Sequence, residues 1–215
     1  MTKSNPIFVS EMAIRVACIG DSLTWGFALA DPWRESYPAV LQEMLREKVG
    51  EGYEVRNFGC NGASVRADSY AGYVDTSAFR SSLAWDPDIV LLMLGSNDAS
   101  PYDWDPEAFR RDYEQIVASY QGLPSAPRII LIAPPRIHRV MGETFMGLSP
   151  EILEGGIRPA IRSVAAAAGF EFIDLVDLFP DARYCFDGVH PHASGARMMA
   201  KAIIDSVKWG CSGMR

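Results

Sequence analysis

The sequence has few of the residues that hold metal ions or build disulfide frameworks. Its 215 residues include only three histidines and four cysteines, and no two cysteines form a CxxC pair. The spacing of Cys18, Cys60, Cys185 and Cys211 matches no zinc pattern. We therefore expect reduced thiols, mostly buried, rather than a metal centre or a catalytic cysteine.

Basic clusters and long apolar runs are also missing. The formal net charge of −7 argues against nucleic acid and against an anionic membrane surface as partners. No stretch approaches the roughly 18 apolar residues of a membrane span, and the N-terminal residues lack the apolar core of a signal peptide. These absences favour a soluble, cytoplasmic protein. They leave its oligomeric state open, and a homo-oligomer is compatible with them.

The apolar content is sufficient for a full core. Apolar residues make up 48% of the chain, and no repeat, low-complexity segment or linker interrupts it. The length favours one domain over residues 1–215. We expect residues 1–12 to be a flexible extension of that domain.

Apolar runs alternate with amphipathic segments from end to end. The runs predict buried strands over residues 14–19, 53–58, 88–94, 129–133 and 170–175. Helical spacing or capping residues predict helices over residues 36–49, 105–120, 149–169 and 193–209. This alternation predicts an α/β fold with a parallel sheet and helices on both faces. Ligands of such folds bind beyond the carboxyl ends of the strands.

A serine follows the first predicted strand, in the segment GDSLTWG. In one interpretation, Ser22 or Thr24 only caps the next helix. In the other, Ser22 is a nucleophile whose hydroxyl and amide face the crevice. The segment has neither the Gly-Lys-Ser/Thr of a phosphate loop nor the G-x-S-x-G of a nucleophile elbow.

The next two strands end in turn-forming residues. Gly59 and Gly62 follow the second strand, and glycine there either permits a turn or lets a backbone N–H approach an oxyanion. Asn97 follows the apolar run DIVLLML and is a common turn former. Its position at the mouth of the crevice also allows its amide to donate to a developing negative charge.

Two of the three histidines lie after the fifth predicted strand, in the segment DGVHPH. Asp187 precedes His190 by three residues, and the intervening glycine allows a tight turn. The carboxylate can then reach Nδ1 of the ring and leave Nε2 free as a base. A metal site made from Asp187, His190 and His192 is the alternative, although no other cluster completes it.

These four strand ends together resemble the marker blocks of the SGNH (GDSL) hydrolase family of esterases and lipases. The blocks read GDSLTWG, NFGCNGAS, GSND and DGVHPHASG, and they span residues 20–195. The first block is similar to that of a subgroup of bacterial arylesterases and acyltransferases. The resemblance implies a three-layer α/β/α sandwich with a central five-stranded parallel sheet, a flavodoxin-like arrangement.

The resemblance also implies an activity, that of a carboxylic ester hydrolase with an acyl-serine intermediate and no metal or organic cofactor. It implies a catalytic triad and an oxyanion hole, with Gly59 a lesser match than Gly62. The triad residues are Ser22, Asp187 and His190. The oxyanion hole comprises the backbone N–H groups of Ser22 and Gly62 and the side-chain amide of Asn97.

The substrate is expected to be a small ester with a short acyl group, such as an O-acetyl sugar or an aryl ester, because little chain is left for a lipid channel. Trp25, Trp104 and Phe145 are the candidate substrate-binding residues. They lie in loops whose side chains line the pocket, cover it, form a subunit contact or pack in the core. Three alternatives remain on the same fold: an acyltransferase with the same triad, a lysophospholipase-like esterase, and a non-catalytic carbohydrate-binding protein. A metallophosphoesterase is a more distant one.

Overall fold

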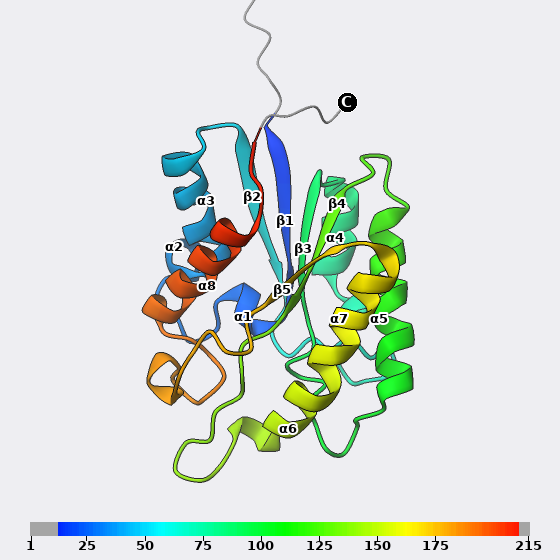
Figure 1. The fold of residues 1–215 in the computed structure, drawn as a ribbon, viewed down its shortest axis with the longest axis vertical. Coiled ribbons are helices and arrows are strands. Elements are labelled where there is room, and N and C mark those ends of the chain that lie inside the picture. Colours follow the sequence, from blue (N-terminus) through cyan, green and yellow to red (C-terminus); the bar gives the residue numbers. More distant parts are fainter. Residues whose placement is uncertain (1–12, 211–215) are drawn as a thin grey trace, which may run out of the picture.

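Five parallel strands form one sheet in the computed structural model, which describes residues 13–210 (Figure 1). The strands are β1 (Ile14–Gly20), β2 (Tyr53–Gly59), β3 (Ile89–Met93), β4 (Arg128–Ala133) and β5 (Glu171–Asp174). Their order is β2-β1-β3-β4-β5, and every neighbouring pair is parallel. The predicted flavodoxin-like sheet is therefore confirmed, with the fully buried β3 at its centre.

Helices cover both faces of the sheet and complete three layers (Figure 1). On one face, α3 (Tyr37–Lys48) packs against α8 (Ala193–Ser206). On the other face lie α4 (Ser77–Trp85), α5 (Pro106–Gln121) and α7 (Arg158–Ala168). Short helices occupy the loops: α1 (Ser22–Trp25), α2 (Pro32–Glu35), α6 (Pro150–Ile152) and the 3₁₀ turns η1 (Tyr73–Asp75), η2 (Phe145–Gly147) and η4 (Ala182–Tyr184).

The helix predicted over residues 149–169 is helical without a break from Pro150 to Ala168, but it is not a regular α-helix throughout. It comprises α6, a π-helical turn η3 (Leu153–Ile157) and α7, and Gly169 caps it with φ of 71°, as the sequence predicts. Pro159 has no N–H to donate to the carbonyl of Gly155, so a regular α-helical bond is absent there. The π turn absorbs this defect.

The C-terminal helix is also shorter than predicted. It ends at Ser206 rather than Trp209, because Val207 takes an extended conformation. The indole N–H of Trp209 then folds back and donates to the carbonyl of Ile204 at 2.9 Å. The sequence of residues 207–209 gave no indication of this turn.

The order of the strands determines where a ligand can enter. β1 lies between β2 and β3. The chain passes from β1 to β2 on one side of β1 and then to β3 on its other side. The helices that follow β1 and β2 lie on opposite faces, so a crevice opens at this switch point beyond the carboxyl ends. The loops after β1, β2, β3 and β5 all meet at this end of the sheet, where α1 lies (Figure 1).

The remaining sequence-based expectations concern thiols, membrane spans and the termini. Cys18 and Cys185 are buried free thiols and Cys60 is half-buried, whereas Cys211 and residues 1–12 lie outside the described residues. Between residues 13 and 210, no helix combines the length and the apolar character needed to cross a bilayer.

Gly59 is required by a close approach of two backbone segments. A Cβ at this position would lie 2.2 Å from the amide nitrogen of Trp25. We expect Gly59→Ala to lower the free energy of unfolding by about 1–3 kcal/mol, because the methyl group forces α1 away from β2. Urea denaturation measures this change. Gly52→Ala is the matched control, since a Cβ there meets no atom within 4 Å, and equal stability of the two variants would contradict the packing argument.

Candidate active site

Ser22 lies at the first turn of α1, directly beyond β1. Asp21 is the N-cap of this helix, and its side chain accepts a hydrogen bond from the amide of Leu23 at 2.9 Å. The interpretation in which Ser22 or Thr24 caps the helix is therefore wrong, because Asp21 already performs that task. The hydroxyl of Ser22 is left for another partner, and Ser22 is only 6% exposed.

That partner is His190. Oγ of Ser22 lies 2.9 Å from Nε2 of His190, although the two residues are 168 positions apart. Nδ1 of the same ring lies 2.7 Å from Oδ2 of Asp187. The three side chains thus form one hydrogen-bonded chain, and both ring nitrogens of His190 are engaged in it.

The turn that holds Asp187 and His190 is fixed by the backbone. Gly188 has φ of 87°, a conformation that favours glycine. The amides of Val189 and His190 donate to Oδ1 of Asp187 at 3.0 and 2.8 Å. Burial alone would raise the pKa of Asp187, but the hydrogen bonds from the backbone and ring of His190 and from Val189 outweigh it and hold that pKa below its usual value. The carboxylate is ionised beside the imidazole.

Three hydrogen-bond donors are available on the neighbouring loops. The amides of Ser22 and Gly62 donate to no other group between residues 13 and 210. Asn97 donates one hydrogen of its side-chain amide to the carbonyl of Ala63 at 2.8 Å, which leaves the second hydrogen for another acceptor. This bond also joins the loop after β3 to the loop after β2, next to Gly62, whose φ is 75°.

Asp98 is a buried acid that sequence analysis did not identify. Its carboxylate accepts hydrogen bonds from the backbone amides of Val65 and Arg66 at 2.9 and 3.1 Å, and the residue is 5% exposed. Asp98 therefore ties the loop of Asn97 to the loop of Gly62 through a second link. Only its place directly after Asn97 could have suggested this role.

Two buried acids of this region, Asp98 and Asp21, have pKa values above their ordinary value. Burial raises the pKa of Asp98 to about 6, although the amides of Val65 and Arg66 oppose the shift. Burial likewise raises the pKa of Asp21 to about 7 against the hydrogen bond from Leu23. Perturbed acids cluster at functional sites more often than elsewhere, so these shifts support the location of the site.

Two phenylalanines enclose the imidazole. The ring of Phe27 lies 4.6 Å from that of His190, and the ring of Phe145 lies edge-on at 4.9 Å. Phe145 was expected to bind substrate, whereas sequence analysis missed Phe27. Its only signal was proximity to the GDSLTWG segment, which Phe27 directly follows.

The other predicted pocket residues lie in different surroundings. Trp104 packs against Phe109 at 5.4 Å and over Gly156, and the side chain of Trp25 is 39% exposed at the end of α1. Their contribution to substrate binding stays a prediction. The ring of His192 packs against Phe186 at 3.9 Å, away from the hydrogen-bonded chain. In the described part of the chain, no three acidic, histidine or cysteine side chains gather as a metal site requires.

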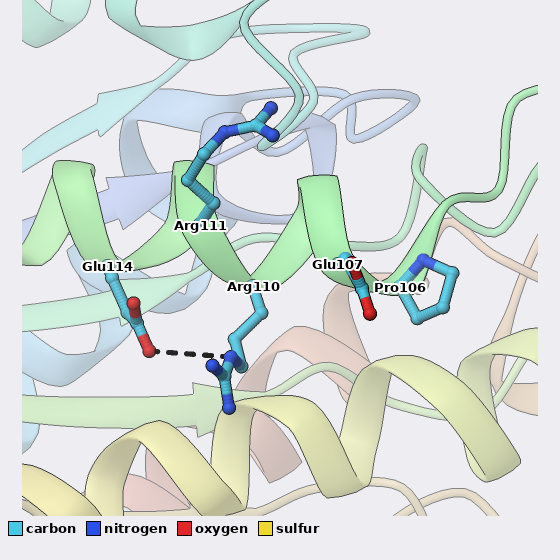
Figure 2. Close-up of a pocket in the computed structure, with 5 residues that line it drawn as sticks. All are labelled: Pro106, Glu107, Arg110, Arg111 and Glu114. Carbon is cyan, nitrogen blue, oxygen red and sulfur yellow. Dashed lines mark ion pairs between the residues drawn. The ribbon is translucent and has the colours of Figure 1, made fainter.

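A hollow of about 610 Å³ lies over the exposed side of α5 and is separate from these loops (Figure 2). It is lined by Pro106, Glu107, Arg110, Arg111 and Glu114. Figure 2 shows Arg110 paired with Glu114, at 3.6 Å, along the helix surface. None of the side chains near Ser22 reaches it, so it is a solvated helix face rather than part of the site.

Comparison with known proteins gives relatives along nearly the whole chain. An acetylxylan esterase from Xylanibacter ruminicola is 32% identical over 92% of this chain, and a multidomain esterase from Ruminococcus flavefaciens is 24% identical over 91%. The chain spans 44% and 28% of the length of these two relatives.

A solved structure of similar fold is that of a catalytic mutant of an acetylxylan esterase from Geobacillus stearothermophilus. The two share a TM-score of 0.73 and 20% identity, over 95% of this chain and 98% of that one. The profile of the GDSL-like Lipase/Acylhydrolase family matches residues 18–198, a range that includes Ser22, Asn97 and His190. The chain belongs to the GDSL-like lipase/acylhydrolase family.

Proposed function

We propose that this chain is a serine ester hydrolase that removes short acyl groups, acetyl above all, from sugars. The observation that carries the proposal is the hydrogen-bonded chain from Asp187 through His190 to Ser22. The 32% identity to an acetylxylan esterase supports the choice of an acetylated sugar as the substrate. An aryl acetate is the simplest substitute for it in an assay.

Attack by the serine is the first step of the proposed reaction. Oγ of Ser22 bonds to the ester carbonyl carbon while Nε2 of His190 accepts its proton. The imidazolium that forms lies against the ionised carboxylate of Asp187, which stabilises the new positive charge and fixes the ring. The 2.9 Å contact between Oγ and Nε2 is within hydrogen-bond reach for this transfer.

The negative charge develops on the former carbonyl oxygen. The free amides of Ser22 and Gly62 and the second hydrogen of the Asn97 amide are its proposed donors. Such donors act more strongly in a partly buried site than in water, because no solvent has to reorganise around the charge. Asp98 acts through them as a positioning residue, because it holds their two loops together.

Collapse of the tetrahedral intermediate completes the first half of the reaction. The bond between carbon and the alcohol oxygen breaks, and His190 returns its proton to that oxygen. Water then attacks the acyl-serine while His190 accepts a proton again, and the acid leaves as Ser22 regains its hydrogen. These steps use side chains and backbone amides of this protein, together with water.

The substrate class is tested with 4-nitrophenyl esters from acetate to palmitate and with acetylated xylose. We expect kcat/KM to fall steeply beyond about six carbons, because a small pocket gains only about 0.8 kcal/mol per buried CH₂ until the chain meets a wall. Ser22→Ala is the control and should lose roughly 10⁴-fold or more in kcat. Faster cleavage of palmitate than of acetate would replace the proposal by a lipid esterase.

The positioning role of Asp98 is tested with Asp98→Asn. Oδ1 of Asp98 accepts from both amides and Oδ2 accepts again from Val65, whereas asparagine replaces one of these oxygens by an NH₂ donor that repels the amide of Val65. The loops of Gly62 and Asn97 therefore shift. We expect kcat for 4-nitrophenyl acetate to fall roughly tenfold with little change in KM, since a misplacement of about 1 Å costs up to about 10²-fold. Asn97→Ala removes a donor outright and should cost roughly 10²–10³-fold. A change confined to KM in Asp98→Asn would contradict the role.

The same variant has a pH signature in stability. The folded-state pKa of Asp98, about 6, lies above the ordinary 3.8, so the folded protein retains a proton that the unfolded chain has released. The contribution of this retained proton to the free energy of unfolding is complete below pH 3.8 and is lost as the pH rises through about 6. The free energy of unfolding of wild type minus that of Asp98→Asn should therefore shrink between pH 4 and 7 in urea denaturation. A difference that is constant with pH would mean that Asp98 titrates normally.

A further inference from the structure

A second hollow, of about 490 Å³, runs along the free edge of β2 between α2 and α3. We call it the β2-edge groove. It is lined by side chains of three elements: Pro32, Trp33, Arg34 and Ser36 around α2, Pro38, Ala39, Gln42, Glu43 and Arg46 on α3, and Val55, Arg56, Asn57 and Phe58 on β2. None of these residues takes part in the hydrogen-bonded chain of Ser22 and His190, so the groove is outside the site described above.

An exposed indole is the main apolar feature of the groove. Trp33 lies on the short helix α2, and 86% of it is exposed. A tryptophan this exposed contributes nothing to the core, whereas its flat face offers a stacking surface to a ligand. The C–H face of a pyranose ring matches such a surface in size and polarity.

The strand edge supplies hydrogen-bonding groups beside the indole. Among residues 13–210, β2 pairs only with β1, so alternate residues of β2 point their backbone groups toward the groove. Gln42 accepts from the amide of Val55 and donates to the carbonyl of Tyr53, which occupies part of this edge. The carbonyl of Val55 and the amide of Asn57 point in the same direction and are an acceptor and a donor for sugar hydroxyls.

The charges around the groove favour a neutral ligand. Arg34 pairs with Asp31 at 3.7 Å, Arg46 with Glu51 at 2.9 Å, and Arg56 with Glu54 at 2.7 Å. Each guanidinium is therefore balanced by its own carboxylate, and Glu43 adds a further negative charge. The paired arginines do not attract a phosphate or a nucleic acid, whereas binding of an uncharged, polyhydroxylated ligand does not depend on a net positive charge.

The groove packs against the segment that carries the serine. Nδ2 of Asn57 donates to the carbonyl of Thr24 at 2.8 Å, on the helix that begins with Ser22. A Cβ at Gly26 would lie 3.2 Å from Pro32, the neighbour of Trp33. The next residue, Phe27, packs against the imidazole of His190. These contacts place the β2-edge groove on the opposite side of α1 from the imidazole, next to the segment that carries Ser22.

We propose that the β2-edge groove is a saccharide subsite, in which a pyranose ring stacks on Trp33 while an acetylated unit of the same oligosaccharide lies at Ser22. This inference rests on the proposed function and adds to it the kind of substrate: a neutral, linear oligosaccharide rather than a single sugar. The subsite contributes binding energy from a part of the substrate remote from the reacting ester.

The test compares two esters in the same enzyme preparations. For wild type, Trp33→Ala and Tyr70→Ala, kcat/KM is measured with acetylated xylohexaose and with 4-nitrophenyl acetate, and the ratio of the two values is formed. Tyr70 is the matched control, because it is a fully exposed aromatic residue outside the groove. Trp33→Ala should lower the ratio roughly five- to tenfold, mainly through KM, whereas Tyr70→Ala should leave the ratio at the wild-type value.

A binding measurement separates failure of the subsite from failure of the proposed function. Unacetylated xylohexaose is titrated calorimetrically into the Ser22→Ala protein with and without the Trp33→Ala change. Weaker binding after the second change supports the subsite without any catalysis. Equal binding, or equal ratios for the Trp33 and Tyr70 variants, overturns the subsite while ester hydrolysis stands. Failure of wild type to cleave either ester overturns the proposed function itself.

Discussion

The parallel direction of the five strands is the constraint on which the site depends. Because every strand runs the same way, the loops after β1, β2, β3 and β5 end at one edge of the sheet. Ser22 and His190, separated by 168 positions, meet there at 2.9 Å. Each loop supplies a different chemical part: a hydroxyl, a free amide, a side-chain amide and an imidazole. The sheet fixes their meeting point, and the loops fix their orientation.

The orientation is maintained by buried polar groups that cost stability. Asp98 and Asp21 lie almost without exposure, and burial raises the pKa of both carboxyls. A group whose charged form is disfavoured in the folded state is a poor choice for stability alone. Their hydrogen bonds from backbone amides hold the loops of Ser22, Gly62 and Asn97 in place. Burial of these acids therefore lowers the free energy of unfolding but preorganises the donors of the site.

Much of this arrangement could be predicted from the sequence, and the reasons for the rest are physical. Apolar runs and their spacing predicted all five strands, because burial in a parallel sheet demands them. Phe27 and Asp98 were missed because their roles depend on contacts with loops 163 and 33 residues away, which no local pattern records. The π turn before α7 and the early end of α8 arise from single residues, Pro159 and Val207, within otherwise regular helical patterns.

The central claim, that Ser22 is the activated nucleophile of this hydrogen-bonded chain, is tested most directly by covalent labelling. The protein is treated with a 4-nitrophenyl alkylphosphonate, and the adduct is located by intact-mass and peptide mass spectrometry. The account predicts one adduct per chain, on Ser22, and none in a protein that carries His190→Ala. An adduct on Cys60 or on a serine other than Ser22, or labelling of Ser22 that is unaffected by loss of His190, would contradict it.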